Sequence, residues 1–360
     1  MDRWIGLLNV SLTGGGGGGG GGCGGGGPLF RVAASLLLSP SSKTLAVQIP
    51  SPPSPPSPPL KTLIKFPNPS PPPPWDQVPS VNAILFNGDR VEGTGDPVIE
   101  KLSDPRNVAE ILVSKLGGAA NAWVVDASTF AGSFAVYKEL VPTVNSRGDP
   151  RRYRPNRLPA SSSIVSILTK CVDQIQSMVS GERIPSPQLQ TTSPRTIILG
   201  FSKGGVVVNQ LLTELPFAAS ESPRSSNNSA SSSTPRETKY HIVPATKERL
   251  LFSIAEFHYV DVGLNCAGAY LTDRVVIKKI ADHLLLRNAS IRFGLHGTPR
   301  QWCDDYRPWI RKEKDTLKQL LEDEARRCGG KLQVLERVYL SNKPPSLQMH
   351  FEIIELMDIS

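Results

Sequence analysis

Along residues 81–360, segments with the apolar pattern of a strand alternate with segments that have the apolar pattern of a helix. Short apolar runs rich in β-branched residues predict strands, and apolar positions three or four residues apart predict helices. The predicted strands cover residues 81–86, 122–126, 196–199, 257–262, 291–295 and 332–340. The predicted helices cover residues 107–116, 164–179, 206–215, 275–286, 309–327 and 351–357. Because the two kinds of element alternate, we expect an α/β fold with helices on both faces of a mostly parallel sheet.

The first 79 residues show no such pattern. Thirteen glycines form one run that only Cys23 interrupts, and fourteen prolines, many of them in Ser-Pro-Pro repeats, lie between residues 50 and 79. We therefore expect residues 1–79 to be a disordered leader and residues 80–360 to be the folded domain. A stretch rich in Ser, Asn and Pro predicts a further disordered insertion at residues 218–236.

Charge changes the interpretation of the leader. The chain has 40 Lys and Arg against 32 Asp and Glu, a net charge of +8, and half of that excess lies in residues 1–75, where Asp2 is the one acidic residue. Acid-poor, basic segments are typical of import signals, which predicts a mitochondrial location, with chloroplast and cytoplasm as alternatives. The Pro-rich tract would then be a stiff spacer, and it could also bind a protein partner that has an aromatic groove.

Several functional classes are not supported by the sequence. No apolar run approaches the roughly 18 residues that a membrane-spanning helix needs. A nucleic-acid-binding module with a basic face is not recognisable either. The five cysteines are scattered without a Cys-x-x-Cys pair, so the spacing gives no metal site, and no cofactor is predicted.

The clearest chemical motif is Gly200-Phe201-Ser202-Lys203-Gly204, a G-x-S-x-G pattern. It lies between the predicted strand 196–199 and the predicted helix 206–215, which is the setting of the nucleophile elbow in α/β-hydrolases. A serine on such a turn stands clear of the sheet, and small flanking residues avoid collision with the neighbouring strand and helix. The alternative is a glycine-rich turn that happens to contain a serine.

A serine nucleophile needs a base and a group that orients the base. In α/β-hydrolases the order along the chain is Ser, then Asp or Glu, then His. His350 fits the last place because it follows the last predicted strand, directly before the terminal helix. We expect Asp304, in the loop after the strand 291–295, to be the acid, and Asp305 and Asp261 remain alternatives.

An oxyanion hole in this fold takes one backbone N–H from the residue after the nucleophile and one from a loop after an early strand. Lys203 supplies the first by its position. Gly88, in Asn87-Gly88-Asp89 after the strand 81–86, is the candidate for the second because glycine permits close backbone approach. Asn-Gly-Asp is also an ordinary turn sequence, which is the alternative interpretation.

These motifs together resemble a known family. The segment Gly200–Gly204, the segment His296-Gly297-Thr298-Pro299-Arg300-Gln301-Trp302-Cys303-Asp304 and the triplet Met349-His350-Phe351 are similar to the chromosome 2 open reading frame 69 family. The resemblance runs from about residue 81 to the end of the chain. It implies an α/β-hydrolase-like fold, a mitochondrial setting in animals and a substrate that is not established. It also implies that Ser202, Asp304 and His350 occupy the nucleophile, acid and base positions.

Two functional hypotheses follow from the sequence. The first is a serine hydrolase that cleaves an ester or a thioester through an acyl-enzyme at Ser202. The second is a protein with a hydrolase fold that binds a partner or metabolite without turnover, since a fold does not by itself fix a function.

Overall fold

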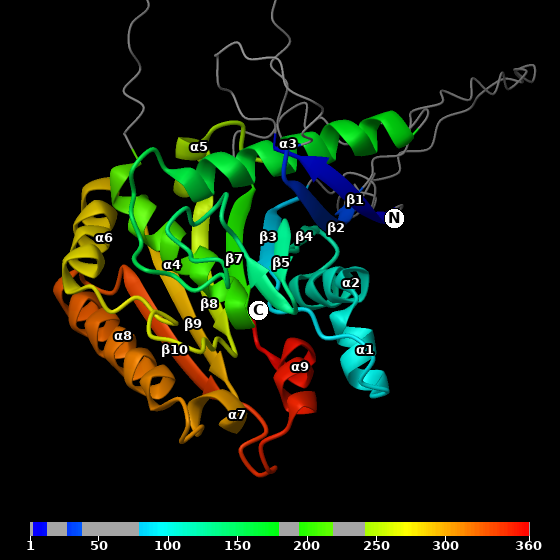
Figure 1. Ribbon diagram of the computed structural model, residues 1–360. Coiled ribbons are helices and arrows are strands. Elements are labelled where there is room, and N and C mark those ends of the chain that lie inside the picture. Colours follow the sequence, from blue (N-terminus) through cyan, green and yellow to red (C-terminus); the bar gives the residue numbers. More distant parts are fainter. Residues whose placement is uncertain (1–2, 13–26, 38–78, 180–193, 219–241, 360) are drawn as a thin grey trace, which may run out of the picture.

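The computed structural model describes residues 3–12, 27–37, 79–179, 194–218 and 242–359 of the chain. These residues form an eight-stranded sheet with the order β1-β2-β4-β3-β7-β8-β9-β10 (Figure 1). The strands are β1 (Arg3–Ser11), β2 (Leu29–Leu37), β3 (Val81–Phe86), β4 (Ala120–Val125), β7 (Arg195–Phe201), β8 (Ile254–Val260), β9 (Ile291–Gly297) and β10 (Leu332–Val338). A separate small hairpin joins β5 (Thr129–Ala131) to β6 (Phe134–Val136).

The direction of the strands defines the fold. The six strands from β4 to β10 in the sheet order pair in parallel, whereas β1 and β2 pair with each other antiparallel and β2 pairs antiparallel with β4. After β3 the chain moves outward to β4 and then returns to the other side of β3 as β7, so the strand order reverses there. This order is that of the α/β-hydrolase fold, and the predicted fold class is confirmed. Open α/β sheets bind ligands beyond the carboxyl ends of the strands at such a reversal.

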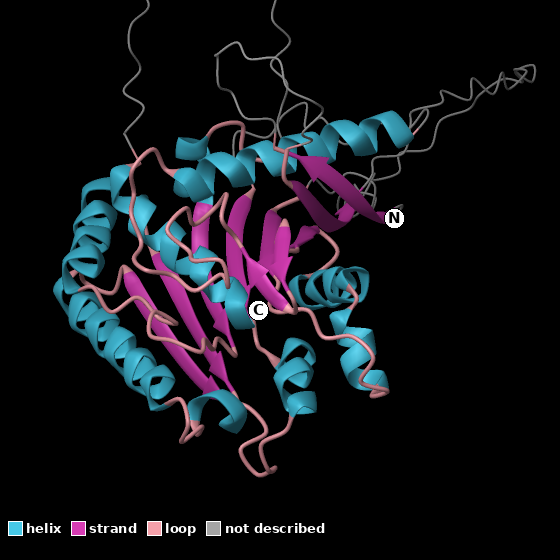
Figure 2. Ribbon diagram, viewed as in Figure 1, coloured by secondary structure: helices cyan, strands magenta, loops and turns pink. Residues whose placement is uncertain are grey.

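Helices cover both faces of the sheet, as Figure 2 shows. One core cluster packs the sheet against five helices and the four-residue helix α7 (Pro299–Trp302), and the other packs it against three. The five are α3 (Pro159–Met178), α4 (Gly205–Glu214), α5 (Lys247–Ser253), α6 (Arg274–Arg287) and α8 (Pro308–Arg327). The three are α1 (Pro97–Ser103), α2 (Pro105–Leu116) and α9 (Leu347–Leu356). Neighbouring strand residues alternate between the two clusters, with Ile84 in the first and Leu85 in the second, because successive side chains of a strand point to opposite faces.

The expected leader is corrected in two places. Residues 3–11 and 29–37 belong to β1 and β2, and the domain therefore does not begin at residue 80. The apolar side chains of this hairpin explain the difference, since Leu8, Val10 and Phe30 are buried in the larger core cluster. The glycine run between the strands, most of the Pro-rich tract and residues 219–236 of the predicted insertion lie outside the described residues.

The other predicted elements are present, with small shifts of their ends. The short helices α1, α5 and α7 (Pro299–Trp302) and the β5–β6 hairpin are not predicted by the apolar pattern. The last helix begins at Leu347 rather than at residue 351, so His350 lies inside its first turn and not before it. Within the described part of the chain, no helix is both long and apolar enough to cross a membrane.

Candidate functional site

Ser202 lies on a sharp turn between β7 and α4. Its φ angle is 52°, a left-handed conformation that costs energy for a residue with a side chain. The flanking glycines make the turn possible: a Cβ on Gly200 would lie 2.7 Å from Val208 Cγ2 and 2.8 Å from the Gly204 carbonyl oxygen. A Cβ on Gly204 would overlap the carbonyl oxygen of Phe86 in the neighbouring strand β3. The G-x-S-x-G spacing is thus explained by the close packing of strand, turn and helix.

Gly204→Ala should therefore destabilise the protein strongly, because the added methyl group would overlap the Phe86 carbonyl oxygen, and the backbone of Phe86 is held between β4 and β7 in the sheet. We expect the free energy of unfolding to fall by about 3 kcal/mol. Gly118→Ala is the matched control, since a Cβ there meets no atom within 4 Å and the change should stay within about 0.5 kcal/mol. Urea denaturation of both variants measures the difference, and equal stability of the two would contradict the steric role of Gly204.

His350 and Asp261 form a buried pair beside this turn. His350 Nδ1 lies 2.7 Å from Asp261 Oδ2, and the imidazole is only 7% exposed while Asp261 is fully buried. The His350 ring also stacks on Phe201, with ring centroids 4.7 Å apart and an interplanar angle of 29°. Because Phe201 directly precedes Ser202, this stacking places the imidazole next to the serine turn.

Asp261 is fixed from several sides. It follows β8 with a φ angle of 45°, and its backbone N–H donates to the His296 carbonyl oxygen at 2.7 Å. The backbone N–H of Thr298 donates to Asp261 Oδ1 at 2.7 Å, and the Thr298 hydroxyl donates to Asp261 Oδ2 at 2.9 Å. These bonds link the carboxyl ends of β8 and β9 and direct the carboxylate at His350. Thr298 belongs to the segment that carries the family resemblance, but it was not among the candidate site residues.

The preference for Asp304 as the partner of His350 is corrected by this geometry. Asp304 accepts a 2.8 Å bond from Arg307 Nε and a 2.9 Å bond from the backbone N–H of Tyr306. Burial alone would raise the pKa of the Asp304 carboxyl, but the hydrogen bond from Arg307 holds that pKa below its usual value. The carboxylate that meets His350 is the alternative, Asp261; neither Asp304 nor Asp305 lines the cavity with His350.

The loop after β3 brings Gly88 against the serine. A Cβ on Gly88 would lie 2.5 Å from Ser202 Cβ and 3.0 Å from Ser202 Oγ, so only glycine allows this approach. Gly88, the candidate for a second backbone donor, thus lies next to Ser202.

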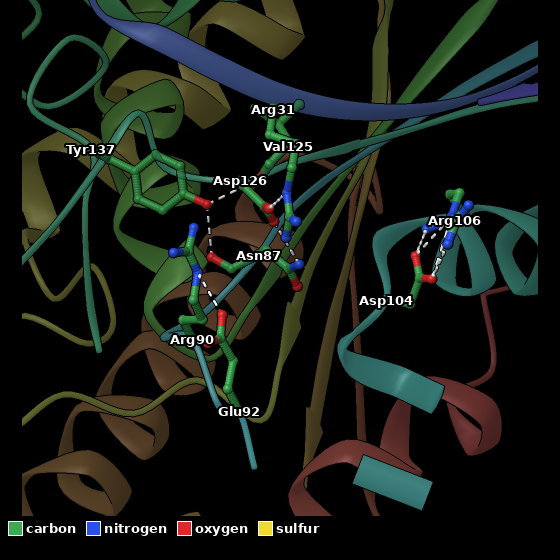
Figure 3. A network of polar contacts seen from close by, with 9 residues as sticks. All are labelled: Arg31, Asn87, Arg90, Glu92, Asp104, Arg106, Val125, Asp126 and Tyr137. Atoms are coloured by element: carbon green, nitrogen blue, oxygen red, sulfur yellow. Dashed lines mark hydrogen bonds and ion pairs between the residues drawn. The ribbon is translucent and has the colours of Figure 1, made fainter. Parts of the chain in front are cut away.

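A polar network holds this loop in place (Figure 3). Asn87 Nδ2 donates to Asp126 Oδ1 at 2.9 Å, and Arg31 Nε of β2 donates to Asp126 Oδ2 at 2.6 Å. The Tyr137 hydroxyl lies 2.7 Å from the Asn87 carbonyl oxygen and 3.1 Å from that of Val125. The N-terminal hairpin is thereby connected to the loop that carries Gly88.

Ser202 and His350 line one cavity of about 250 Å³ at the carboxyl ends of the strands. Asp89, Lys203 and Gly263 are among the other residues of its wall. The described hydrogen bonds include none between the Ser202 hydroxyl and His350, although both side chains face this space. An adjoining cavity of about 400 Å³ shares Asp89 and other residues with the first and extends over the loop after β3.

The side chain of Lys203 anchors a neighbouring loop. Its Nζ donates to the Arg147 carbonyl oxygen at 2.5 Å, lies 3.5 Å from Asp149 Oδ1 and is 4.8 Å from the centre of the Phe134 ring. The side chain is almost completely buried. Lys203 therefore has a structural role through its side chain that is separate from any role of its backbone N–H.

Two other histidines lie apart from this cavity. His258 Nδ1 and His296 Nε2 are 2.9 Å apart between β8 and β9, and His258 Nε2 is 2.9 Å from Glu256 Oε2. Burial lowers the pKa of both imidazoles, that of His296 to about 3. The part of the chain that the structure describes contains no group of three or more His, Cys, Asp or Glu side chains able to hold a metal ion.

Sequence comparison finds similarity to one protein family. The C2orf69 family profile matches residues 160–325, which include Ser202 and Asp261 and end before His350. The mitochondrial protein C2orf69 homolog of Mus musculus is 28% identical over 171 residues, which cover 47% of this chain and 37% of the mouse protein. The mitochondrial protein C2orf69 of Homo sapiens is 29% identical over 160 residues, which cover 44% of this chain and 32% of the human protein. The chain is therefore similar to the C2orf69 family over somewhat less than half of its length.

This similarity agrees with the resemblance seen in the sequence, and the names of both C2orf69 relatives support the predicted mitochondrial location. The chain spans about a third of the length of these curated relatives. One similar solved structure is a thermostable esterase, which is 13% identical with a TM-score of 0.37; the match covers 93% of this chain and 55% of the esterase chain. Another is Zea mays acyl-protein thioesterase 2, which is 12% identical with a TM-score of 0.35; the match covers 78% of this chain and 93% of the thioesterase chain. A third is the siderophore hydrolase EstB of Aspergillus nidulans, which is 8% identical with a TM-score of 0.38; the match covers 91% of each chain.

Proposed function

We propose that this protein is a serine hydrolase that cleaves an ester or a thioester, with Ser202 as nucleophile, His350 as base and Asp261 as the group that orients the base. The observation that carries the proposal is the His350–Asp261 pair, because it lies against Phe201 and shares a cavity with the strained Ser202 turn. A buried carboxylate on Nδ1 fixes the imidazole so that Nε2 is left to receive a proton. The proposal replaces Asp304 by Asp261 in the acid position.

The reaction would run in two halves. His350 Nε2 takes the proton of the Ser202 hydroxyl as Oγ attacks the carbonyl carbon of the substrate, and the same proton then passes to the departing alcohol or thiol. Water next attacks the acyl-enzyme, gives one proton to His350 and releases the acid, after which the proton returns to Ser202. Asp261 remains ionised and stabilises the imidazolium in both halves.

The negative charge that develops on the carbonyl oxygen needs donors already in place. The backbone N–H of Lys203, directly after Ser202, is the first donor in this proposal. The second is the N–H of Gly88, and the close approach of Gly88 to the Ser202 side chain supports that position. The network of Asn87, Asp126 and Tyr137 would keep this donor fixed during the reaction.

A fluorophosphonate probe tests the nucleophile directly. The wild-type protein should become labelled, Ser202→Ala should not, and Ser133→Ala should be labelled like wild type because Ser133 lines the same cavity without standing on the turn. Mass spectrometry of the labelled peptide identifies the modified residue. An unlabelled wild type, or equal labelling of Ser202→Ala, would refute the hydrolase proposal.

The second candidate function is binding without turnover. The observation that favours it is that the described hydrogen bonds join Ser202 to no base, so the catalytic contact would have to form when a substrate enters. Catalytic hydrogen bonds of empty sites are often long and tighten in the complex, which is why hydrolysis remains the first proposal. A wild type that binds a ligand in the cavity but resists the fluorophosphonate would support the second function.

A further inference from the structure

The charges around the cavity are not balanced. Four cationic side chains, those of Arg90, Lys203, Arg300 and Arg307, line it together with His350, against the single carboxylate of Asp89. Three of these cations have a carboxylate of their own outside the cavity wall. Arg90 lies 3.6 Å from Glu92, Lys203 3.5 Å from Asp149, and Arg307 2.8 Å from Asp304.

Arg300 is different. Among the described residues no side chain or carbonyl oxygen accepts a hydrogen bond from its guanidinium group, and its Nε is buried without a partner. Burial lowers the pKa of Arg300, which reflects a charge that has lost part of its hydration, although an arginine keeps its proton at neutral pH. Leaving such a donor unpaired is costly, and a ligand group that accepts from it would recover that cost.

The neighbouring residue provides a second observation. Gln301 is only 5% exposed, lines the same cavity and has a buried Oε1 without a hydrogen-bond partner in the described structure. The amide packs against Gly263, where a Cβ would overlap Gln301 Oε1. Buried side-chain oxygens are nearly always hydrogen-bonded in folded proteins. Two adjacent residues of α7 that line the cavity therefore each have a buried polar atom without a hydrogen-bond partner among the described residues.

From this arrangement we infer that the cavity accepts a substrate that carries an anionic oxygen group, a carboxylate or a phosphate, which Arg300 binds while Gln301 accepts from an N–H or O–H of the same molecule. This inference rests on the proposed function, because it names the substrate class for the Ser202 site. Guanidinium groups match carboxylate and phosphate oxygens in geometry as well as charge. The cleaved ester or thioester would thus lie over Ser202 and the anionic group over α7.

Binding measured without turnover tests the inference. In Ser202→Ala, calorimetric titration with monomethyl glutarate is compared with its neutral counterpart dimethyl glutarate, and glycerol 1-phosphate is compared with glycerol. We expect at least one anion to bind about 10–100-fold more tightly than its neutral counterpart, as one charge-assisted contact allows. The two pairs distinguish a carboxylate from a phosphate substrate.

Substitutions of the arginine identify the contact. Adding Arg300→Gln should remove the preference for the anion, Arg300→Lys should keep much of it, and Arg311→Gln on the exposed side of α8 should not change it. Equal affinity for anionic and neutral probes, no binding of either anion at millimolar concentration, or a preference that survives Arg300→Gln would overturn the inference. Anion binding that depends on Arg300, in a wild type that does not react with the fluorophosphonate, would refute the hydrolase and leave the anion-binding role of Arg300 standing. With Ser202 intact, hydrolysis of 4-nitrophenyl pentanoate and mono-4-nitrophenyl glutarate at equal rates by the wild type and by Arg300→Gln, together with no hydrolysis by Ser202→Ala, would support the hydrolase and refute this inference.

Discussion

Asp261→Asn should lower kcat/KM for a neutral 4-nitrophenyl ester by about 10⁴-fold, the loss that follows when the acid of a Ser-His-Asp triad becomes an amide. The physical reason lies in the 2.7 Å contact between Asp261 Oδ2 and His350 Nδ1. An asparagine can turn its NH₂ group toward His350, which then holds its proton on Nε2 and cannot accept one from Ser202. Steady-state rates of the purified variant measure the effect.

Asp304→Asn is the control that separates the two acids. Its carboxylate binds Arg307 at the edge of the site and does not contact the imidazole, so we expect the rate with the neutral ester to change by less than about twofold. Thermal unfolding of both variants shows whether a lost activity reflects lost folding, because Asp261 also accepts two bonds from Thr298. A normal rate for Asp261→Asn, or a collapse for Asp304→Asn, would reject the assignment of Asp261.

The acid could not be chosen from the sequence for a physical reason. Chain order requires only that it lie between Ser202 and His350, and Asp261 and Asp304 both do. The choice depends on where α9 packs, since the stacking of His350 on Phe201 brings the imidazole to the end of β8. The structure shows a local feature that the predicted strand 257–262 concealed: Asp261, like Ser202, directly follows a buried strand, and both have a positive φ angle.

The central sheet was predictable because its strands are buried on both faces. β3 and β4 are buried at every position, so their sequences form continuous apolar runs that periodicity detects. The turn at Ser202 was predictable because its glycines are required by contacts with the adjacent strand and helix. Arg300 and Gln301 gave no such signal, since an unpaired donor is a property of the surroundings of a side chain and not of its position in a motif.

The hairpin β1–β2 was missed because composition was averaged over a leader dominated by glycine and proline. Its buried apolar residues face the larger core cluster at intervals along each strand, and Arg31 extends from β2 to Asp126. The hairpin therefore contributes both to the core and to the network behind Gly88. An import segment that ran to residue 79 and was removed as a whole would take two strands of the sheet with it.

Phe30→Ala should thus reduce the free energy of unfolding by about 3–5 kcal/mol, the usual cost of removing a fully buried phenylalanine from a core. Leu29→Ala is a closely matched control, because Leu29 is the preceding residue of the same strand and is 54% exposed. It should change the stability by less than about 0.5 kcal/mol. Urea denaturation of the two variants, measured on the full chain, gives the comparison.

A truncation that lacks residues 1–37 extends the same test to the site. Without Arg31, Asp126 loses one partner and the Asn87 loop loses part of its support, so fluorophosphonate labelling of Ser202 should slow together with the loss of stability. Deletion of residues 51–59 in the Pro-rich tract, outside the described residues, is the control for chain length and should leave both properties unchanged. If Phe30→Ala and the truncation behaved like their controls, the hairpin would not belong to the folded domain, and the boundary at residue 80 that the sequence predicts would be restored.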